Sequence, residues 1–219
     1  MTPKLVIFDC DGVVVDSEII TNTFLRDEMA AHGLDLPLDQ IMGLFVGGTI
    51  AGVAVQAREL GARLPQDWVE TFYPRLCDKL AEGTPMIPGI VGVLERLEGA
   101  SIPYCIGSNG RHMKMRATLG QHPELAARFT SNVFAATDVA RPKPAPDLFL
   151  FACEQMNHTP KASIIIEDSP AGVTAAKAAG IKVLGYIGAA HDKDRQKDKL
   201  IEAGADQIIE CLQNINAHI

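Results

Sequence analysis

The feature that most constrains the fold is a series of short apolar runs in which polar residues do not alternate with apolar ones. These runs occupy residues 4–9, 103–108, 133–136, 163–167, 182–186 and 207–209. Continuous apolar sequence of this length is typical of parallel strands that helices cover on both faces. Segments with helical spacing follow or separate the later runs, at residues 89–98, 111–120, 146–157, 170–179 and 194–203. The alternation predicts an α/β fold with a doubly wound parallel sheet.

The stretch between the first run and residue 85 has a different pattern. It contains no convincing strand, and helical spacing recurs at residues 18–32, 49–61 and 66–81. We expect Asp16 or Ser17 to cap the first of these helices. We therefore predict an all-helical cap at residues 17–84 that sits over the sheet. The α/β core would then consist of residues 1–16 and 85–219. Within the cap, we expect Trp68, Phe72 and Tyr73 to form the apolar interior.

Composition excludes several classes of protein. The chain is 47% hydrophobic and 21% charged, which favours a packed core over disorder. Its net charge of -7 excludes a basic nucleic-acid-binding domain. The five cysteines are scattered and form no C-x-x-C pair, so they indicate neither a disulfide framework nor a zinc site. No stretch reaches the roughly 20 apolar residues of a membrane span. We expect a cytoplasmic monomer that binds neither nucleic acid nor membrane.

Polar side chains lie at the carboxyl ends of four predicted strands. They are Asp9 and Asp11 at the end of the first, Ser108 and Asn109 at the end of the second, Lys143 after the third, and Glu167 and Asp168 at the end of the fourth. Each group has an ordinary explanation on its own, because such residues are common in turns and helix caps. Parallel strands, however, bring their carboxyl ends to one edge, where ligands bind. Their coincidence at successive strand ends favours a site.

The residue types indicate which chemistry this site performs. Several carboxylates would repel one another in a partly desolvated cleft, and Mg²⁺ with oxygen ligands would relieve that repulsion. Lys143 adds a second positive charge and Ser108 a neutral donor, as a transferring phosphoryl group requires. The residues therefore favour Mg²⁺-dependent phosphoryl transfer. Asp9 would attack phosphorus and form an aspartyl phosphate, and Asp11 would act as general acid and later activate water.

Four sequence motifs carry a family resemblance. They are D-C-D-G-V-V-V-D-S-E at residues 9–18, S-N-G at 108–110, K-P-A-P-D at 143–147 and I-E-D-S at 166–169. Taken together and in this order, they resemble the motifs of the haloacid dehalogenase-like hydrolases. The likeness is strongest to the phosphatase and β-phosphoglucomutase branch, which has a helical cap after the first motif. It spans essentially the whole chain, and the set is specific although no single motif is.

The resemblance implies roles for individual residues. Asp9 would be the nucleophile and a metal ligand, and Asp11 the acid/base, holding the metal through its backbone carbonyl. Ser108 and Lys143 would bind the transferring phosphoryl group, with Asn109 as a further donor. The metal shell would be completed by Asp168, and Glu167 would sit on the metal or on one of its waters.

The resemblance also leaves alternative functions to weigh. The implied activity is hydrolysis of a small phosphomonoester, such as a sugar, polyol or sugar-acid phosphate. A β-phosphoglucomutase would hold a second phosphate with basic residues of the cap loop, but residues 44–50 contain no Lys or Arg. We expect Gly48 in that loop to contact the leaving group. A phosphonate-cleaving relative would need a cap lysine, and only Lys79 is present. A non-catalytic metal-binding module is the most distant alternative.

Overall fold

The computed structural model describes residues 2–45 and 49–218. In this part of the chain, six parallel strands form one sheet with the order β3-β2-β1-β4-β5-β6. The strands are β1 (Leu5–Phe8), β2 (Tyr104–Ser108), β3 (Val133–Ala135), β4 (Ser163–Glu167), β5 (Lys182–Tyr186) and β6 (Gln207–Ile209). The predicted doubly wound α/β sheet is confirmed. Each strand lies within, or within one residue of, a predicted apolar run.

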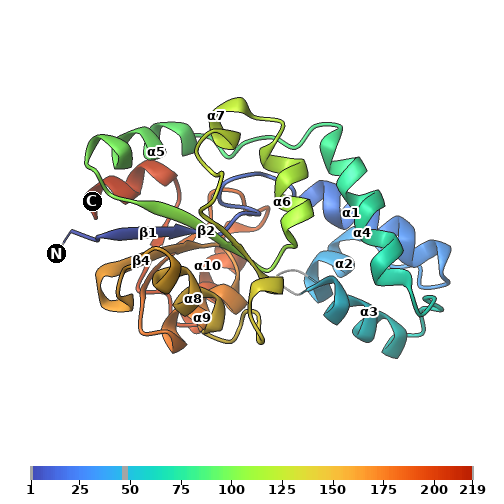
Figure 1. Ribbon diagram of the computed structural model, residues 1–219. Helices are drawn as coiled ribbons and strands as arrows, with labels where there is room; N and C mark the ends of the chain where they lie inside the picture. The colour runs from blue at the N-terminus through green and yellow to red at the C-terminus, as the bar shows by residue number, and fades with distance from the viewer. Residues whose placement is uncertain (1, 46–48, 219) are drawn as a thin grey trace.

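Helices cover both faces of the sheet (Figure 1). They are α5 (Ile90–Gly99), α6 (His112–Leu119), α7 (Pro123–Ala126), α8 (Asp147–Gln155), α9 (Pro170–Ala178) and α10 (Lys193–Glu202), with short 3₁₀ helices η1 (Ala136–Asp138), η2 (Pro160–Ala162) and η3 (Leu212–Ala217). An apolar cluster packs on each face of the sheet. In β1, Val6 and Phe8 belong to one cluster, and Leu5 and Ile7 belong to the other. Because both faces of β1 are buried, each of its residues is apolar, and this continuous apolar run is the pattern that predicts the strand.

Four helices form the cap, which lies beyond the carboxyl end of β1 (Figure 1). They are α1 (Glu18–Ala31), α2 (Leu38–Phe45), α3 (Ile50–Glu59) and α4 (Trp68–Ala81). The cap has its own apolar cluster, in which the rings of Trp68 and Phe72 stack with centroids 4.5 Å apart. The predicted cap interior is confirmed for these two residues. Tyr73 is buried but lines a cavity instead. The proposed boundaries at residues 17 and 84 stay a prediction.

The chain enters and leaves the cap through two paired segments. Val15 forms an antiparallel bridge with Met86. The backbone N–H of Asp16 donates to the Pro85 carbonyl at 2.8 Å, and that of Ile87 donates to the Val14 carbonyl at 3.0 Å. The two connections to the cap therefore lie side by side, as a hinge requires.

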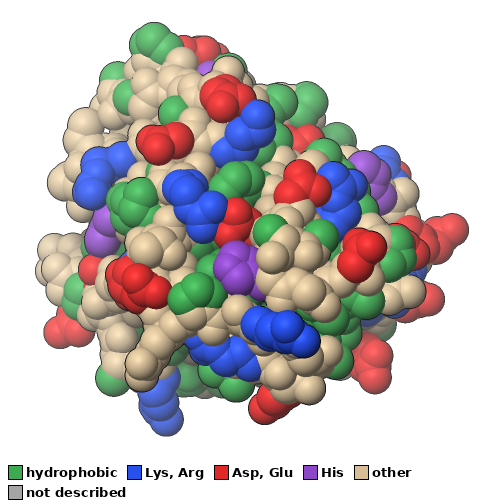
Figure 2. Space-filling view, turned by 90° about the vertical axis from the view of Figure 1, so that its right-hand side faces the viewer, with side chains coloured by type: hydrophobic (Ala, Val, Ile, Leu, Met, Phe, Trp, Pro, Cys, Tyr) green, Lys and Arg blue, Asp and Glu red, His purple; other side chains and the backbone are tan. Residues whose placement is uncertain are grey.

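The surface of the cap end carries mixed charges. Figure 2 shows acidic and basic side chains interspersed on this face. Among the described residues, no single helix is long and apolar enough to cross a membrane. The helices α2 and α3 meet that test only as a pair, and they are bent by 116°.

Candidate active site

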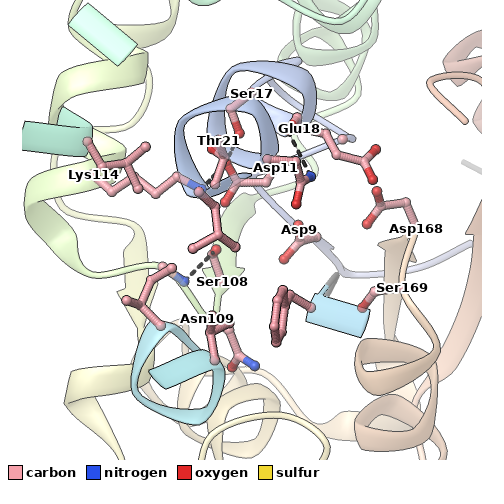
Figure 3. A pocket seen from close by; sticks show the side chains of 18 of the residues that line it. Asp9, Asp11, Ser17, Glu18, Thr21, Ser108, Asn109, Lys114, Asp168 and Ser169 are labelled. Atoms are coloured by element: carbon pink, nitrogen blue, oxygen red, sulfur yellow. Dashed lines mark hydrogen bonds and ion pairs between the residues drawn. The ribbon is translucent and has the colours of Figure 1, made fainter. Parts of the chain in front are cut away.

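The predicted site residues meet at the carboxyl edge of the sheet, below the cap (Figure 3). Asp9, Asp11, Ser108, Asn109, Lys143 and Asp168 line a cavity of about 130 Å³ between core and cap. Glu167 lies behind them, and Gly48 falls outside the described residues. The cavity is completed by residues of α1, α2, α3 and α4, so the cap closes the space above the strand ends.

A buried ion-pair network organises the centre of the site. The Lys143 ammonium donates to Asp9 Oδ1 at 2.6 Å and to Glu167 Oε2 at 2.7 Å, and all three side chains are buried. Burial raises the pKa of Asp9 to about 7, with Glu167 and Asp11 adding to the rise and Lys143 opposing it. Burial also disfavours the Lys143 ammonium, but Asp9 and Glu167 outweigh that effect and raise its pKa. Lys143 therefore remains a cation.

Three carboxyl groups in this region could hold a metal. Asp9, Glu167 and Asp168 each offer an oxygen atom within 4.8 Å of the others. Burial raises the pKa of Asp168 well above its usual value, and the charges of Asp9 and Glu167 raise it further. A hard divalent cation with oxygen ligands would relieve this repulsion. The donor set therefore fits a divalent metal ion.

Glu167 is fixed on both of its oxygens. Oε2 accepts from Lys143, while Oε1 accepts from the backbone N–H of Ser169 at 3.1 Å and from its hydroxyl at 2.8 Å. The backbone of Gly172 packs so closely that a Cβ atom there would lie 1.9 Å from the Glu167 carboxyl. These contacts place Glu167 behind the cavity, where it orients Lys143.

Asp11 has two partners that the sequence analysis did not identify. The Lys114 ammonium of α6 lies 2.9 Å from Asp11 Oδ1, and the Ser17 hydroxyl donates to the same oxygen (Figure 3). Burial tends to raise the pKa of Asp11, but the Lys114 ammonium and these hydrogen bonds outweigh it and lower that pKa. Ser17 occupies the N-cap position of α1, yet its side chain makes no capping hydrogen bond. Of the two predicted N-cap residues, Ser17 therefore holds the position, but its side chain binds Asp11 in place of the helix backbone.

The loop that carries Lys143 is held by Asn109. The Asn109 side chain donates to the Lys143 carbonyl and accepts from the Lys143 N–H, both at 3.0 Å. The nearby Ser108 hydroxyl accepts from the Gly110 N–H at 3.1 Å. Asn109 thus positions Lys143, and its expected contact with a phosphoryl group stays a prediction.

Core and cap also touch beside the cavity, through Arg111. Its guanidinium binds Glu70 of α4 through two contacts of 3.1 Å and lies 4.6 Å from the Tyr73 ring centroid. Lys79, in contrast, pairs with Glu82 on the exposed surface of the cap. It does not line the cavity, so the phosphonate alternative gains no support from it.

Comparisons with known proteins identify the family of this chain. A family model described as haloacid dehalogenase-like hydrolase matches residues 3–180. A probable pseudouridine-5'-phosphatase of Drosophila melanogaster is 30% identical over 187 residues, covering 81% of this chain and 79% of the relative. A 6-phosphogluconate phosphatase of Escherichia coli is 28% identical, covering 87% of this chain and 85% of the relative. A haloacid dehalogenase-like crystal structure from Agrobacterium tumefaciens has 31% identity and a TM-score of 0.82, covering 98% of this chain and 96% of that one.

Proposed function

Because the chain belongs to the haloacid dehalogenase-like hydrolases, we propose that it is a Mg²⁺-dependent phosphatase that acts on a small sugar or polyol phosphomonoester. Relatives named as phosphatases support a phosphoric monoester hydrolase. The reaction would pass through an aspartyl phosphate on Asp9.

One observation carries the proposal. The Asp9 carboxylate lines the cavity together with Ser108, is paired at 2.6 Å with a buried ammonium, and has an oxygen within 4.8 Å of an Asp168 oxygen. A carboxylate attacks phosphorus only in its ionised form, and Lys143 favours that form. The same ammonium carries the positive charge that phosphoryl oxygens need in the transition state.

The residues around Asp9 fit a resident Mg²⁺ ion. Asp9 and Asp168 would hold it, and the family resemblance adds the backbone carbonyl of Asp11. Both Glu167 oxygens already accept hydrogen bonds, which favours a place for Glu167 behind the ion. The ion would supply positive charge that lets a phosphoryl group approach several carboxylates.

The chain's own side chains then divide the reaction between them. Asp9 attacks phosphorus while the bond to the leaving oxygen breaks. Asp11, whose pKa is lowered, must first take up a proton from solvent, which it then gives to that oxygen. Asp11, now ionised, takes a proton from the water that hydrolyses the aspartyl phosphate. Lys114 and Ser17 stabilise this ionised form. Lys143 and Ser108 hold the phosphoryl oxygens throughout.

The charges of the cavity favour hydrolysis over a mutase reaction. A mutase must hold a second phosphate group in the cap. Among the described lining residues, the cations are Lys114 and Lys143, and each is already paired with an acid of the core. This agrees with the absence of Lys and Arg from residues 44–50.

The proposal is tested by phosphoenzyme trapping. With acetyl phosphate and Mg²⁺, we expect turnover that stops in EDTA and resumes when Mg²⁺ is restored. Acid-quenched protein should carry phosphate on Asp9, as peptide mass spectrometry would show. The Asp9→Asn variant should lose both turnover and label, whereas the exposed control Asp78→Asn should keep both. Phosphate release without a labelled Asp9 would contradict the mechanism.

A further inference from the structure

The three acids that could hold the metal are fixed in different ways. Asp9 and Glu167 each accept a hydrogen bond from the Lys143 ammonium, which balances their charge. Asp168 lies outside these two ion pairs but offers a carboxyl oxygen within 4.8 Å of both acids. Figure 3 shows its carboxyl group turned toward those of Asp9 and Glu18. Because like charges repel, this carboxyl group is pushed outward unless its backbone is restrained.

Gln196 of α10 restrains that backbone. Its side-chain nitrogen donates a hydrogen bond to the Asp168 carbonyl. This carbonyl lies beyond the end of β4 at Glu167 and before α9, in which the Ser169 carbonyl is the acceptor for the N–H of Val173. It therefore belongs to neither the strand nor the helix. A side-chain donor fixes the peptide plane at this point, and so restricts the backbone torsions that direct the Asp168 side chain.

Helix α10 is itself firmly packed, so it can act as an anchor. Leu200 lies one turn after Gln196 and is fully buried in an apolar cluster, where α10 packs on α9 and β5. The Asp192 side chain caps the helix by accepting from the Arg195 N–H at 3.0 Å. The hydrogen bond from Gln196 therefore connects the Asp168 loop to a fixed part of the core.

Gln196 lies outside the cavity where the reacting groups meet. It lines a cleft of about 300 Å³ between α10 and the cap helix α2, together with Met42 and Gly43. Asp168 lines both this cleft and the cavity, so it stands between Gln196 and the reacting groups. None of the four motifs includes a residue of α10. Gln196 is therefore placed to act through Asp168 rather than on the substrate.

We propose that Gln196 is a positioning residue of the metal site, which keeps Asp168 directed toward Mg²⁺ against the charges of Asp9 and Glu167. The proposal rests on the Mg²⁺-dependent function above and adds a residue that the four motifs do not contain. Without this hydrogen bond, Asp168 turns outward when no metal is bound, and metal binding must bring it back. The affinity for Mg²⁺ then falls although every ligand is still present.

Titration calorimetry with Mg²⁺ on the Gln196→Leu variant tests this role. We expect the dissociation constant to rise about three- to tenfold, the factor that one net hydrogen bond contributes. With acetyl phosphate, the Mg²⁺ concentration for half-maximal rate should rise by the same factor, while kcat at saturating Mg²⁺ stays near that of wild type. The Tm in EDTA should fall by no more than about 5 °C, the cost of one such bond. Gln207→Leu makes the same change at an exposed position of the core and should leave all three values unchanged.

The two kinetic readouts separate positioning from a merely structural role. Wild-type Mg²⁺ affinity in Gln196→Leu, or an equal loss in Gln207→Leu, would overturn the proposal. A lower kcat at saturating Mg²⁺ with unchanged affinity would also overturn it. Gln196→Met removes the donor but keeps an unbranched side chain, and failure of both Gln196 variants to fold would contradict the small cost expected for one bond.

The wild-type protein distinguishes this proposal from the proposed function. If it binds Mg²⁺ but hydrolyses no phosphate ester, the proposed function fails, and the role of Gln196 at the metal site is still decided by calorimetry. Absence of Mg²⁺ binding to the wild type would overturn both.

Discussion

Lys143 is the residue whose removal most sharply tests the electrostatics of the site. Its side chain is 2% exposed, and its ammonium is shared by Asp9 and Glu167, whose side chains are 10% and 1% exposed. The Lys143→Met change keeps an unbranched chain of similar length but leaves both carboxyl groups without a cation. Breaking a buried ion pair by removing one partner costs about 3–5 kcal/mol. For a chain of this size, roughly 2–4 °C of Tm correspond to each kcal/mol.

The loss should depend on pH, because Asp9 can take up a proton. Burial already raises the pKa of Asp9 to about 7 with Lys143 present, and removing Lys143 raises it further. Above the unfolded pKa of about 4, the folded state then binds more protons than the unfolded state, so its stability falls as the pH rises. We expect a loss near 3 kcal/mol at pH 6 and one about 1 kcal/mol larger at pH 8, because wild-type Asp9 itself loses its proton between these pH values.

Urea unfolding in EDTA at the two pH values measures this loss without a bound metal. Lys177→Met is the matched control, because Lys177 pairs with Asp206 at the same 2.6 Å but with side chains 42% and 32% exposed. That exposed pair should contribute less than about 1 kcal/mol. Adding Glu167→Gln to Lys143→Met should recover part of the stability. A loss no larger than that of Lys177→Met, or no gain in the double variant, would refute the reasoning.

Three further predictions concern the nucleophile, a glycine and the metal. Asp9→Asn should lower kcat by several orders of magnitude without lowering Tm, because an amide is not a nucleophile; activity above a few per cent of wild type would remove Asp9 from the mechanism. Gly12→Ala should weaken Mg²⁺ binding by calorimetry, because Gly12 has a φ of +80° and a Cβ would lie 2.0 Å from an Asp168 oxygen; wild-type affinity would contradict this. Mg²⁺ should raise Tm more at pH 8 than at pH 6, since protons compete with metal for Asp9 and Asp168, whose pKa values are raised. Equal shifts at both pH values would contradict a site on these acids.

The sheet is predictable because its signals are local. A strand covered on both faces must be apolar throughout, and the run at residues 4–9 contains β1 as a result. Helix α9 begins at Pro170 and ends before Gly180, as its flanking residues indicate. Helix α2 is not predicted by the sequence pattern. Its eight residues include Gly43 and bury only Ile41 and Phe45 among those described, too few for a clear helical period. Helix α7 is a single turn and has no period at all.

The contact of Lys114 with Asp11 escapes prediction for a different reason. Lys114 lies in a helix whose sequence carries no motif, and it meets Asp11 only because α6 follows β2, which pairs directly with β1. The sequence pattern places Tyr73 in the cap interior because it is adjacent to Phe72. It lines the cavity instead, because α4 packs on α6 of the core and exposes that side to the site. In both cases the deciding contact joins segments that are far apart in sequence.

The chemistry of the site follows from local sequence signals, whereas its selectivity depends on contacts between segments that are far apart in sequence. A parallel sheet places the residues after β1, β2 and β4 at one edge, so Asp9, Ser108 and Asp168 can be grouped from the order of the strands along the chain. No such rule groups the cap residues that line the cavity, because the cap helices each contribute one to four side chains and their packing decides which ones face it. Glu18, Thr21 and Asn22 differ from the other polar residues of α1 in that placement. A change in cap packing would therefore alter substrate choice while the strand ends continue to determine the reaction.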